Sequence, residues 1–578
     1  MKRIIGLILA MCLLCGCGAG KTSQESTMPE PSQETQPTEP QPLAFNLSRE
    51  MIFTSRFDAV TEIHLSDEGI SVDGAGETDT VYTSRDILYY EEKTSYESGN
   101  PYGAGESWEQ HSADEAAAHT VVNITKPGAY QVSGKLSKGQ IRIDLGEEAC
   151  SDPDAVVELI LSDADITCTV APAILFLNVY ECDGGWSVET AKPDVDTDGA
   201  GANLILNGEN TVTGSHVAKI YKDKEGEKKL WKQDGAIYSY MSMSVFGPGK
   251  LELTADNEGL DTELHLTING GEIAIRADND GINTNEDGVS VTTINGGKLH
   301  IMAGLGAEGD GIDSNGYLVI NGGTVVSAAN PGADAGLDSD LGSFVHGGNV
   351  IALGSTMDWA ESDSEQVTMN LQFSQNQSAD AAVVVTRQDG TVIFAYDPGT
   401  DEVLAGNSRV YSGAVVSCPN FHVGETYYVY VDGVLNGTDY SGIYDPTTIT
   451  DYTGGTRMAY TGTDVMRRPG GMGFGAEPPE NFDPNKLPAD FDPNSMPADF
   501  DPGKQPEGME KGERPEMPEG IEAGKMPEDF KPGEKPADMP QGMDFPGGFE
   551  QTAEAGTPTA EFYMQDKVNF FSGLQKNQ

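Results

Sequence analysis

Short runs in which apolar and polar residues alternate recur through the middle of the chain, and a glycine-rich turn precedes each run. Alternation with a period of two predicts short, half-buried β-strands. The second glycine of the turn advances along the chain by 22, 26, 26 and 25 residues. Self-similarity at this spacing indicates a solenoid whose repeats stack on their neighbours. The runs are "FGPGKLELTA" from Phe246, "INGGEIAIRA" from Ile268, "INGGKLHIMA" from Ile294, "INGGTVVSAA" from Ile320 and "HGGNVIALGS" from His346.

The residues of each repeat select among the classes of solenoid. Leucine-rich repeats are excluded because their leucine and asparagine frame is missing, and helical repeats would not tolerate several glycines per unit. Each unit instead holds two or three strand-like runs separated by Gly, Asn and Asp, which describes one coil of a parallel β-helix. Asn-Gly-Gly supplies the positive φ angles that a tight corner needs. We therefore expect an all-β solenoid, although the pattern alone leaves the hand of the helix open.

The regions on either side of the repeats differ from them in composition. We expect the β-helix to occupy residues 120–356, after a variable and at first strand-like region over 45–119. Alternation over Met369–Gly437 predicts a small antiparallel β cap, within 357–465, that would cover the last coil. Residues 466–556 are rich in Pro, Glu, Asp, Met and Gly, which predicts a disordered insertion. The apolar end of the chain, 557–578, is expected to return to the fold as a terminal strand.

The N-terminus has the features of a lipoprotein signal. Lys2 and Arg3 precede the apolar run Ile4–Leu14, which is too short to span a bilayer. Leu14-Cys15-Gly16-Cys17 is typical of a lipobox, so we expect residues 1–16 to be removed and Cys17 to carry the lipid. Residues 17–44 are polar and predict a solvated tether. These features favour an extracellular, membrane-anchored lipoprotein, and an ordinary secretory signal with a chance cysteine is the alternative.

Composition limits the partners that this chain can bind. A formal net charge of −57 makes nucleic acid an unfavourable partner, because phosphate binding needs clustered Lys and Arg. A polyanionic ligand would have to be met through a local basic patch or a bridging cation. The 70 glycines suit a turn-rich β protein better than a helical one.

An acidic turn recurs once in each repeat. Stacked coils lie about 4.8 Å apart, so equivalent turn residues should form a ladder. Two carboxylates at that distance repel by roughly 3 to 4 kcal/mol at an effective dielectric constant of about 20. Calcium bound between the oxygens would offset this repulsion, whereas zinc is disfavoured because the turns lack His and Cys. The alternative is that these side chains cap turns and point into water. The candidate ligands are Asp261, Asn283, Asp313 and Asp338, flanked by Asp278, Asp280, Asp310 and Asp340.

The repeats, together with several other segments, resemble a known family. It is the secreted bacterial carbohydrate-binding family typified by a clostridial cellulose- and polygalacturonate-binding protein. The resemblance extends from about Thr120 to Gly433 and implies a right-handed parallel β-helix that carries calcium ions and binds polysaccharide without cleaving it. The segments that carry the resemblance are "VVNITKPGAYQVSGKLSKGQIRID" (Val121–Asp144), "VVELILSDADITCTVAPAI" (Val156–Ile174), "LILNGENTVTG" (Leu204–Gly214) and "DGAIYSY" (Asp234–Tyr240).

Two other classes of function remain open at this stage. A calcium-dependent polysaccharide lyase would use Lys or Arg as the base, but no Lys or Arg occurs from Leu299 to Thr386, and Arg276 and Lys298 are the nearest candidates. A structural or adhesive surface protein is the second alternative. For binding, Trp359, Tyr317 and Tyr238 are candidates for stacking on sugar rings. The lysine-rich stretch 219–232 is a further candidate, with a solvated loop as its alternative.

Overall fold

The computed structural model describes residues 42–46, 51–90, 109–184, 187–221, 230–355, 358–403, 409–463 and 557–577. The expected signal peptide, Cys17, most of the tether and the insertion 466–556 lie outside these residues. The chain divides into two compact units, Met1–Pro42 and Leu43–Gln578, and every element named below belongs to the second. The described residues are almost entirely β, with one short helix, α1 (Ala113–Ala117), which confirms the all-β class. None of the helices in this part of the chain is long and apolar enough to cross a membrane.

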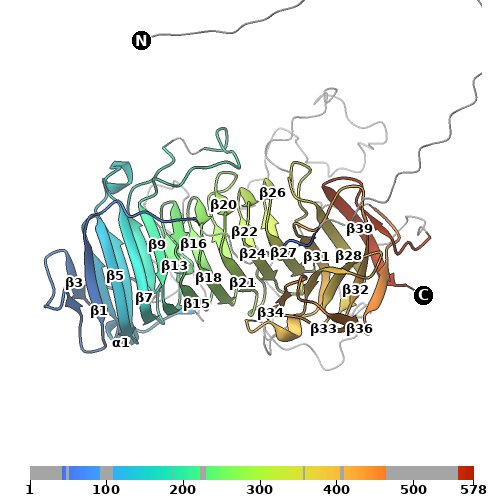
Figure 1. Ribbon diagram of the computed structural model, residues 1–578. Helices are drawn as coiled ribbons and strands as arrows, with labels where there is room; N and C mark the ends of the chain where they lie inside the picture. Colours follow the sequence, from blue (N-terminus) through green and yellow to red (C-terminus); the bar gives the residue numbers. More distant parts are fainter. Residues whose placement is uncertain are drawn as a thin grey trace, which may run out of the picture. The chain divides into compact units, whose positions relative to one another are not determined.

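Most strands fall into three ladders of parallel strands, here called A, B and C (Figure 1). Ladder A contains β9 (Ala202–Asn207), β14 (Met243–Phe246), β17 (Leu266–Ile268), β20 (Val291–Ile294), β23 (Tyr317–Ile320) and β26 (Gly342–Val345). Ladder B contains β10 (Glu209–Gly214), β15 (Lys250–Ala255), β18 (Glu272–Ala277), β21 (Lys298–Met302), β24 (Thr324–Ala328) and β27 (Asn349–Gly354). Ladder C contains β4 (Thr120–Ile124), β6 (Gly139–Asp144), β8 (Ile174–Asn178), β13 (Gly235–Ser239), β16 (Glu258–Thr262), β19 (Ile282–Thr284), β22 (Ile312–Ser314) and β25 (Leu337–Ser339).

Each sequence repeat contributes one strand to each ladder. The chain passes through β22, β23 and β24, then through β25, β26 and β27, and every strand pairs in parallel with its counterpart one repeat away. The Asn-Gly-Gly turn joins ladder A to ladder B. Its amides are linked along the stack, since Asn295 donates to Asn269 Oδ1 and Asn321 donates to Asn295 Oδ1, both at 2.9 Å.

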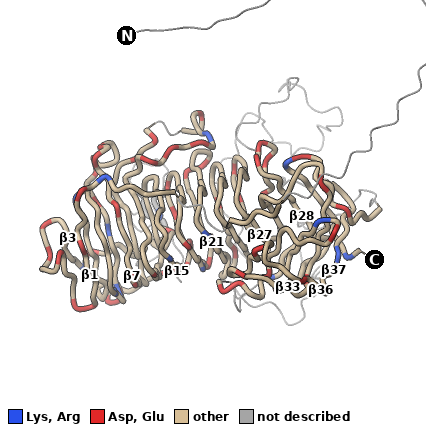
Figure 2. Tube along the Cα trace, viewed as in Figure 1, with Lys and Arg blue, Asp and Glu red and all other residues tan. Residues whose placement is uncertain are grey.

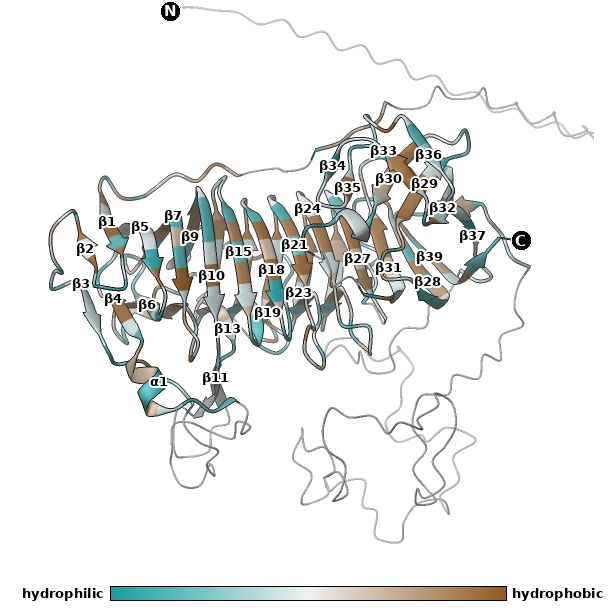
Figure 3. Cartoon of the chain, turned by 90° about the horizontal axis from the view of Figure 1, so that it is seen from below, coloured by the Kyte–Doolittle hydropathy of each residue, from teal (hydrophilic) through white to brown (hydrophobic). Residues whose placement is uncertain are grey.

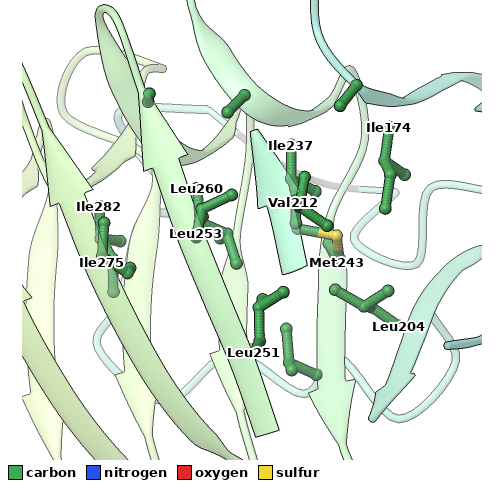
Figure 4. Packing of buried hydrophobic residues seen from close by; sticks show 14 of the residues in the cluster. Ile174, Leu204, Val212, Ile237, Met243, Leu251, Leu253, Leu260, Ile275 and Ile282 are labelled. Atoms are coloured by element: carbon green, nitrogen blue, oxygen red, sulfur yellow. The ribbon is translucent and has the colours of Figure 1, made fainter. Parts of the chain in front are cut away.

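The core is built from apolar side chains that repeat in register. In ladder C, Ile237 pairs with Leu260, Leu260 with Ile282, and Ile282 with Ile312, and all four are 0% exposed. Figure 4 shows three of these side chains beside residues of ladder B: Ile237 beside Val212, Leu260 beside Leu253 and Ile282 beside Ile275. Full burial of one such side chain contributes roughly 1.5 to 3 kcal/mol, so the periodic apolar positions stabilise every repeat in the same way.

The parallel stack begins earlier in the chain than residue 120. β1 (Val60–Leu65) pairs in parallel with β5 (Gly128–Leu136), and β5 pairs with β7 (Val157–Thr167). The two halves of β7 pair with β9 and β10, so one long strand leads into both ladders A and B. β2 (Ser71–Val72) and β3 (Val81–Ser84) are antiparallel additions to β1 and β4. The hairpin of β11 (Val217–Tyr221) and β12 (Leu230–Gln233) precedes β13.

An antiparallel cap follows the last repeat (Figure 3). β27 pairs antiparallel with β31, and β31 pairs antiparallel with β28, so the parallel order ends there. The C-terminal β39 pairs in parallel with β28, which returns the end of the chain to the cap. The cap strands are β28 (Thr368–Gln377), β29 (Val383–Arg387), β30 (Val392–Tyr396), β31 (Tyr411–Ser417), β32 (Thr426–Val431), β33 (Val434–Asn436), β34 (Asp439–Tyr440), β35 (Ile443–Tyr444), β36 (Asp451–Thr453), β37 (Thr456–Ala459), β38 (Phe562–Tyr563) and β39 (Val568–Lys576).

We expect the turn glycine Gly323 to be intolerant of a side chain for two reasons. Its φ is +83°, and an added Cβ would lie 2.6 Å from the carbonyl oxygen of Gly297 in the preceding repeat. Gly390 is a matched control, because its φ is +88° but no atom lies within 4 Å of the added Cβ. Gly390→Ala should cost about 1 kcal/mol from backbone strain and Gly323→Ala about 2 to 3 kcal/mol. Denaturant unfolding of both variants measures the difference, and equal losses would contradict close stacking at this turn.

Candidate functional site

Ladder C brings the acidic turns of successive repeats into one row. Its register sets Asp261 of β16 against Asn283 of β19, Asn283 against Asp313 of β22, and Asp313 against Asp338 of β25. We call these four residues the acidic row, and the spacing of the repeats predicted this alignment. Because neighbouring strands lie about 4.8 Å apart, ionised carboxylates in the row repel one another unless protons or cations neutralise them.

The acidic residues beside the row divide into two groups. The Asp280 carboxylate accepts a hydrogen bond of 2.7 Å from the Asp310 N–H, and the Asp310 carboxylate accepts one from the Ala335 N–H. These bonds join each turn to the next, which is the capping role that the sequence left open. Asp278 and Asp340 are exposed. Asp280 is itself buried, at 8% exposed, whereas Asp278 and Asp340 keep contact with solvent.

The most deeply buried acidic groups lie at the start of the row. Glu258 is 3% exposed, Asp261 0% and Asn283 5%. Among the described residues, Glu258 Oε2, Asp261 Oδ2 and Asn283 Oδ1 have no hydrogen-bond partner. Glu258 nevertheless lies within hydrogen-bonding reach of both Asp261 and Asn283. Oxygens that face one another with no proton between them are costly to bury, so this group of three requires a proton or a cation.

Lys232 supplies part of the counter-charge. Its Nζ lies 2.7 Å from Asp234 Oδ2 and 3.8 Å from Glu258 Oε1. Burial by itself would lower the pKa of Lys232, but the carboxylates of Asp234, Glu258 and Asp261 outweigh it and hold the pKa well above its usual value. One ammonium group against three ionised carboxylates leaves two negative charges, which is the charge that one divalent cation would balance.

Asp261 and Asp313 of the row, and Asp280 beside it, have raised pKa values. Desolvation by burial is the largest cause for Asp261, Asp280 and Asp313, and each pKa lies well above the ordinary value for Asp. For Asp261, repulsion from Glu258 adds to this effect, while Lys232 opposes it. Burial also raises the pKa of Glu258, against the attraction of Lys232. The row therefore has a strong tendency to take up positive charge.

The oxygens at the start of the row fit a calcium ion better than a zinc ion. Calcium takes six to eight oxygen ligands at about 2.3 to 2.6 Å, and Glu258, Asp261 and Asn283 offer three oxygens without hydrogen-bond partners. Within the part of the chain that the structure describes, no three His, Cys, Asp or Glu side chains are arranged to hold a metal ion. A calcium ion would therefore depend on the Asn283 amide, on backbone carbonyls and on water as well as on the two carboxylates.

The structure adds three residues that the sequence pattern did not single out. Glu258 belongs to the acidic turn, but nothing in the sequence indicated that it points inward. Lys232 ends the lysine-rich stretch, of which residues 222–229 lie outside the described chain. Asp358 accepts hydrogen bonds from Ser339 at 2.6 Å and Ser343 at 3.3 Å, and burial raises its pKa to about 7. It comes from a segment outside the repeats, so periodicity could not have identified it.

Two of the three aromatic residues expected to stack on sugars are buried. Tyr238 is 0% exposed and Trp359 is 8% exposed. The Tyr238 hydroxyl donates to Glu263, its ring packs against Tyr240 with centroids 5.1 Å apart, and Trp359 belongs to the hydrophobic core. The expectation of sugar stacking at these two positions is therefore wrong, because neither ring has a free face. Tyr317 is half-buried on β23 and keeps some exposed surface.

Comparison with known proteins identifies the family. A family model described as "Carbohydrate-binding domain-containing protein" matches residues 118–414, just over half of the chain. The chain belongs to this family. The match begins and ends within about twenty residues of the Thr120–Gly433 region that carries the resemblance in the sequence.

The chain is similar to a curated protein over part of its length and to a solved structure. A curated carbohydrate-binding domain-containing protein of Acetivibrio thermocellus is 32% identical over 157 residues, which cover 27% of this chain and 45% of that protein. The alignment thus spans less than half of the relative. A solved structure of a polysaccharide lyase-like protein from C. thermocellum, a gadolinium derivative, has 21% identity and a TM-score of 0.29. The match covers 50% of this chain and 93% of that one.

We expect the chain to lose stability in metal-free buffer as the pH rises. Asp261, Asp280 and Asp313 have folded pKa values above the unfolded value of 3.8, so the folded state binds more protons. The resulting stability is fully present below that value and is lost as pH rises through the folded pKa values. Asp358 contributes a loss that builds up from the unfolded value of 3.8 to its folded pKa of about 7. Thermal unfolding from pH 4 to pH 8 in chelator measures the decline.

The variant Asp261→Asn tests the origin of this decline. Its amide carries no proton equilibrium, so the drop in stability between pH 5 and pH 8 should shrink by at least about 1.4 kcal/mol, the equivalent of one pKa unit. Asp58→Asn, at an exposed position, should leave the pH profile unchanged. A wild-type pH profile that Asp261→Asn leaves unaltered would show that the row does not titrate as described.

Proposed function

We propose that the chain is a cell-surface carbohydrate-binding protein, stabilised by calcium, that binds plant-type polysaccharide such as polygalacturonate or cellulose without cleaving it. Its three ladders are then the faces of a right-handed parallel β-helix. A lipid on Cys17, after removal of residues 1–16, anchors the mature chain outside the cell. Membership of the carbohydrate-binding family over residues 118–414 supports the binding function.

One observation carries the calcium part of the proposal. Glu258 Oε2, Asp261 Oδ2 and Asn283 Oδ1 are buried and have no hydrogen-bond partner among the described residues. A hard cation bound to all three oxygens would satisfy them together and remove the repulsion between Glu258 and Asp261. Calcium bound only to the folded chain would stabilise it by about 2.7 kcal/mol at a concentration one hundred times Kd.

The charge of the chain limits how an acidic polysaccharide can bind. A protein with a net charge of −57 repels a polyuronate at long range, so attraction must be local. A calcium ion on the acidic row has room for ligands beyond those of the protein, because Asp313 and Asp338 are partly exposed and Asp340 is exposed. Uronate carboxylates of the polymer would complete its coordination there.

Polysaccharide cleavage is less well supported than binding. A lyase needs a basic side chain that can accept a proton close to the cation. Lys232 is close to Glu258, but its pKa is held well above the usual value, so it carries a proton at neutral pH. Arg276 and Lys298 belong to ladder B, whereas the acidic row belongs to ladder C.

Retention on immobilised polygalacturonate tests the proposal. The chain without its signal peptide should be retained in calcium and released by chelator, while the length of the polymer stays unchanged. Asp261→Asn should weaken retention at least tenfold, because it removes one carboxylate of the proposed calcium site. The exposed Asp58→Asn control should behave as wild type.

The other outcomes separate the alternatives. Shortened polymer would support the lyase. Retention that persists in chelator would overturn calcium bridging but not carbohydrate binding. Absence of retention on both polygalacturonate and cellulose would favour the structural or adhesive role.

A further inference from the structure

Lys and Arg are rare in the repeats, and those present line the same cavity. Between Gln233 and Thr386 the sequence contains three Lys or Arg residues, Lys250, Arg276 and Lys298. All three line a single cavity of about 370 Å³ on the outer face of ladder B, beside the cap. We call this cavity the ladder B groove. Acidic positions recur along the turns of the chain, whereas basic ones are sparse (Figure 2).

The floor of the groove is an ion-paired row across three strands. The register sets Lys250 of β15 against Glu272 of β18 and Glu272 against Lys298 of β21. The two Nζ atoms lie 3.3 and 3.1 Å from the Glu272 carboxylate. Partial burial would raise the pKa of Glu272, but the two ammonium groups outweigh it and hold the pKa below its usual value. This row alone carries one positive charge, and Glu252 and Glu402 also line the groove, so its three basic residues balance its three glutamates.

Arg276 lies on the same face of β18, four residues beyond Glu272. Its guanidinium group donates to the carbonyl oxygen of Glu402 at 3.3 Å. Within the described residues it forms no ion pair with a carboxylate, unlike Lys250 and Lys298. A half-buried guanidinium group with unused N–H donors is suited to binding a planar carboxylate through two parallel hydrogen bonds.

The cap supplies a preformed wall for the groove. Asp401 is 1% exposed and accepts hydrogen bonds from Tyr396 OH at 3.0 Å and from the Val403 N–H at 2.8 Å, and it lies 3.3 Å from His300 Nδ1. These bonds fix the loop next to Glu402. Tyr440 of β34 also lines the groove and is 38% exposed. Its ring centroid lies 6.0 Å from that of Phe45, and the ring keeps the exposed surface that Tyr238 and Trp359 lack.

We propose that the ladder B groove binds a uronic acid unit of a polysaccharide directly, with no bridging metal ion. Arg276 and Lys298 bind the sugar carboxylate, the Tyr440 ring packs against the sugar ring, and Glu252 accepts hydrogen bonds from hydroxyl groups. The volume of the groove lies within the roughly 300 to 1,000 Å³ typical of ligand sites. This inference rests on the proposed polysaccharide binding and adds a second contact, separate from the acidic row.

A purely structural role for the basic residues explains fewer of these observations than carboxylate binding does. Attachment of the cap would account for the bond from Arg276 to the Glu402 carbonyl, but a neutral donor would serve that purpose equally well. It would not account for the gathering of all three basic residues of a 154-residue stretch, from 233 to 386, in one groove. In a chain with 92 acidic and 35 basic residues, a groove whose three basic residues balance its three glutamates repels an anion less than the average surface of the chain does.

Titration calorimetry with two matched oligosaccharides tests the groove. One probe is a short oligogalacturonate and the other is the same oligomer with its carboxyl groups reduced to alcohols, both in calcium-containing buffer. Arg276→Gln should weaken binding of the acidic oligomer at least tenfold, equivalent to about 1.4 kcal/mol, and change that of the reduced oligomer less than twofold. Lys135→Gln is the control, since Lys135 is an exposed ladder residue on β5 that pairs with Asp165.

The outcomes distinguish this inference from the proposed function. Equal effects of Arg276→Gln on the two oligomers, or no effect on either, would overturn direct carboxylate binding while polysaccharide binding itself stands. Binding of neither oligomer by the wild type, together with no retention on the polymers, would overturn both proposals. Lys298→Gln provides a second test if Arg276→Gln lowers the melting temperature, and it should show the same selective loss for the acidic oligomer.

Discussion

Parallel hydrogen bonding in register is the constraint on which the rest of this structure depends. It places each residue about 4.8 Å from its equivalent in the next repeat. An interaction between two equivalent residues is therefore repeated along the whole stack. For apolar residues this repetition is favourable, as in the row from Ile237 to Ile312, which is fully buried. For amides it is also favourable, since the side chains of Asn269, Asn295 and Asn321 hydrogen-bond in series.

For carboxylates the same constraint is unfavourable, and the chain responds in two ways. Asp280 and Asp310 turn toward backbone N–H groups and join one turn to the next. Glu258 and Asp261 are buried, which raises their pKa values, and Lys232 neutralises only part of their charge. The repulsion is strongest at this end of the row, and the proposed calcium site is therefore placed there.

The two faces of the stack differ in charge. Ladder C carries the acidic row, whereas on the outer face of ladder B three basic residues balance three glutamates beside the cap. A polyuronate could thus meet a metal-mediated contact on one face and a direct contact on another. The cap has a second role in this arrangement: besides covering the last repeat through β31 and β28, its loop at Asp401 forms one wall of the groove.

The sequence by itself determined the repeat, and with it much of the fold. The spacing of the Asn-Gly-Gly turns and the period-two apolar positions predicted stacked strands, the acidic row and an antiparallel cap, because each of these depends on local pattern and register. The sequence did not predict which of the aromatic side chains are buried. Tyr238 and Trp359 looked like sugar-binding aromatics, yet both are in the interior.

Only the tertiary structure brought together residues that are distant in the chain. Lys232 and Glu258 meet through the pairing of successive strands. Arg276 meets Glu402 because the cap folds back against ladder B. Pattern along the chain records which way a side chain points relative to its own strand, but not which other segment covers it. The fold could therefore be predicted from periodicity, while the partners of each charged group were decided by long-range packing.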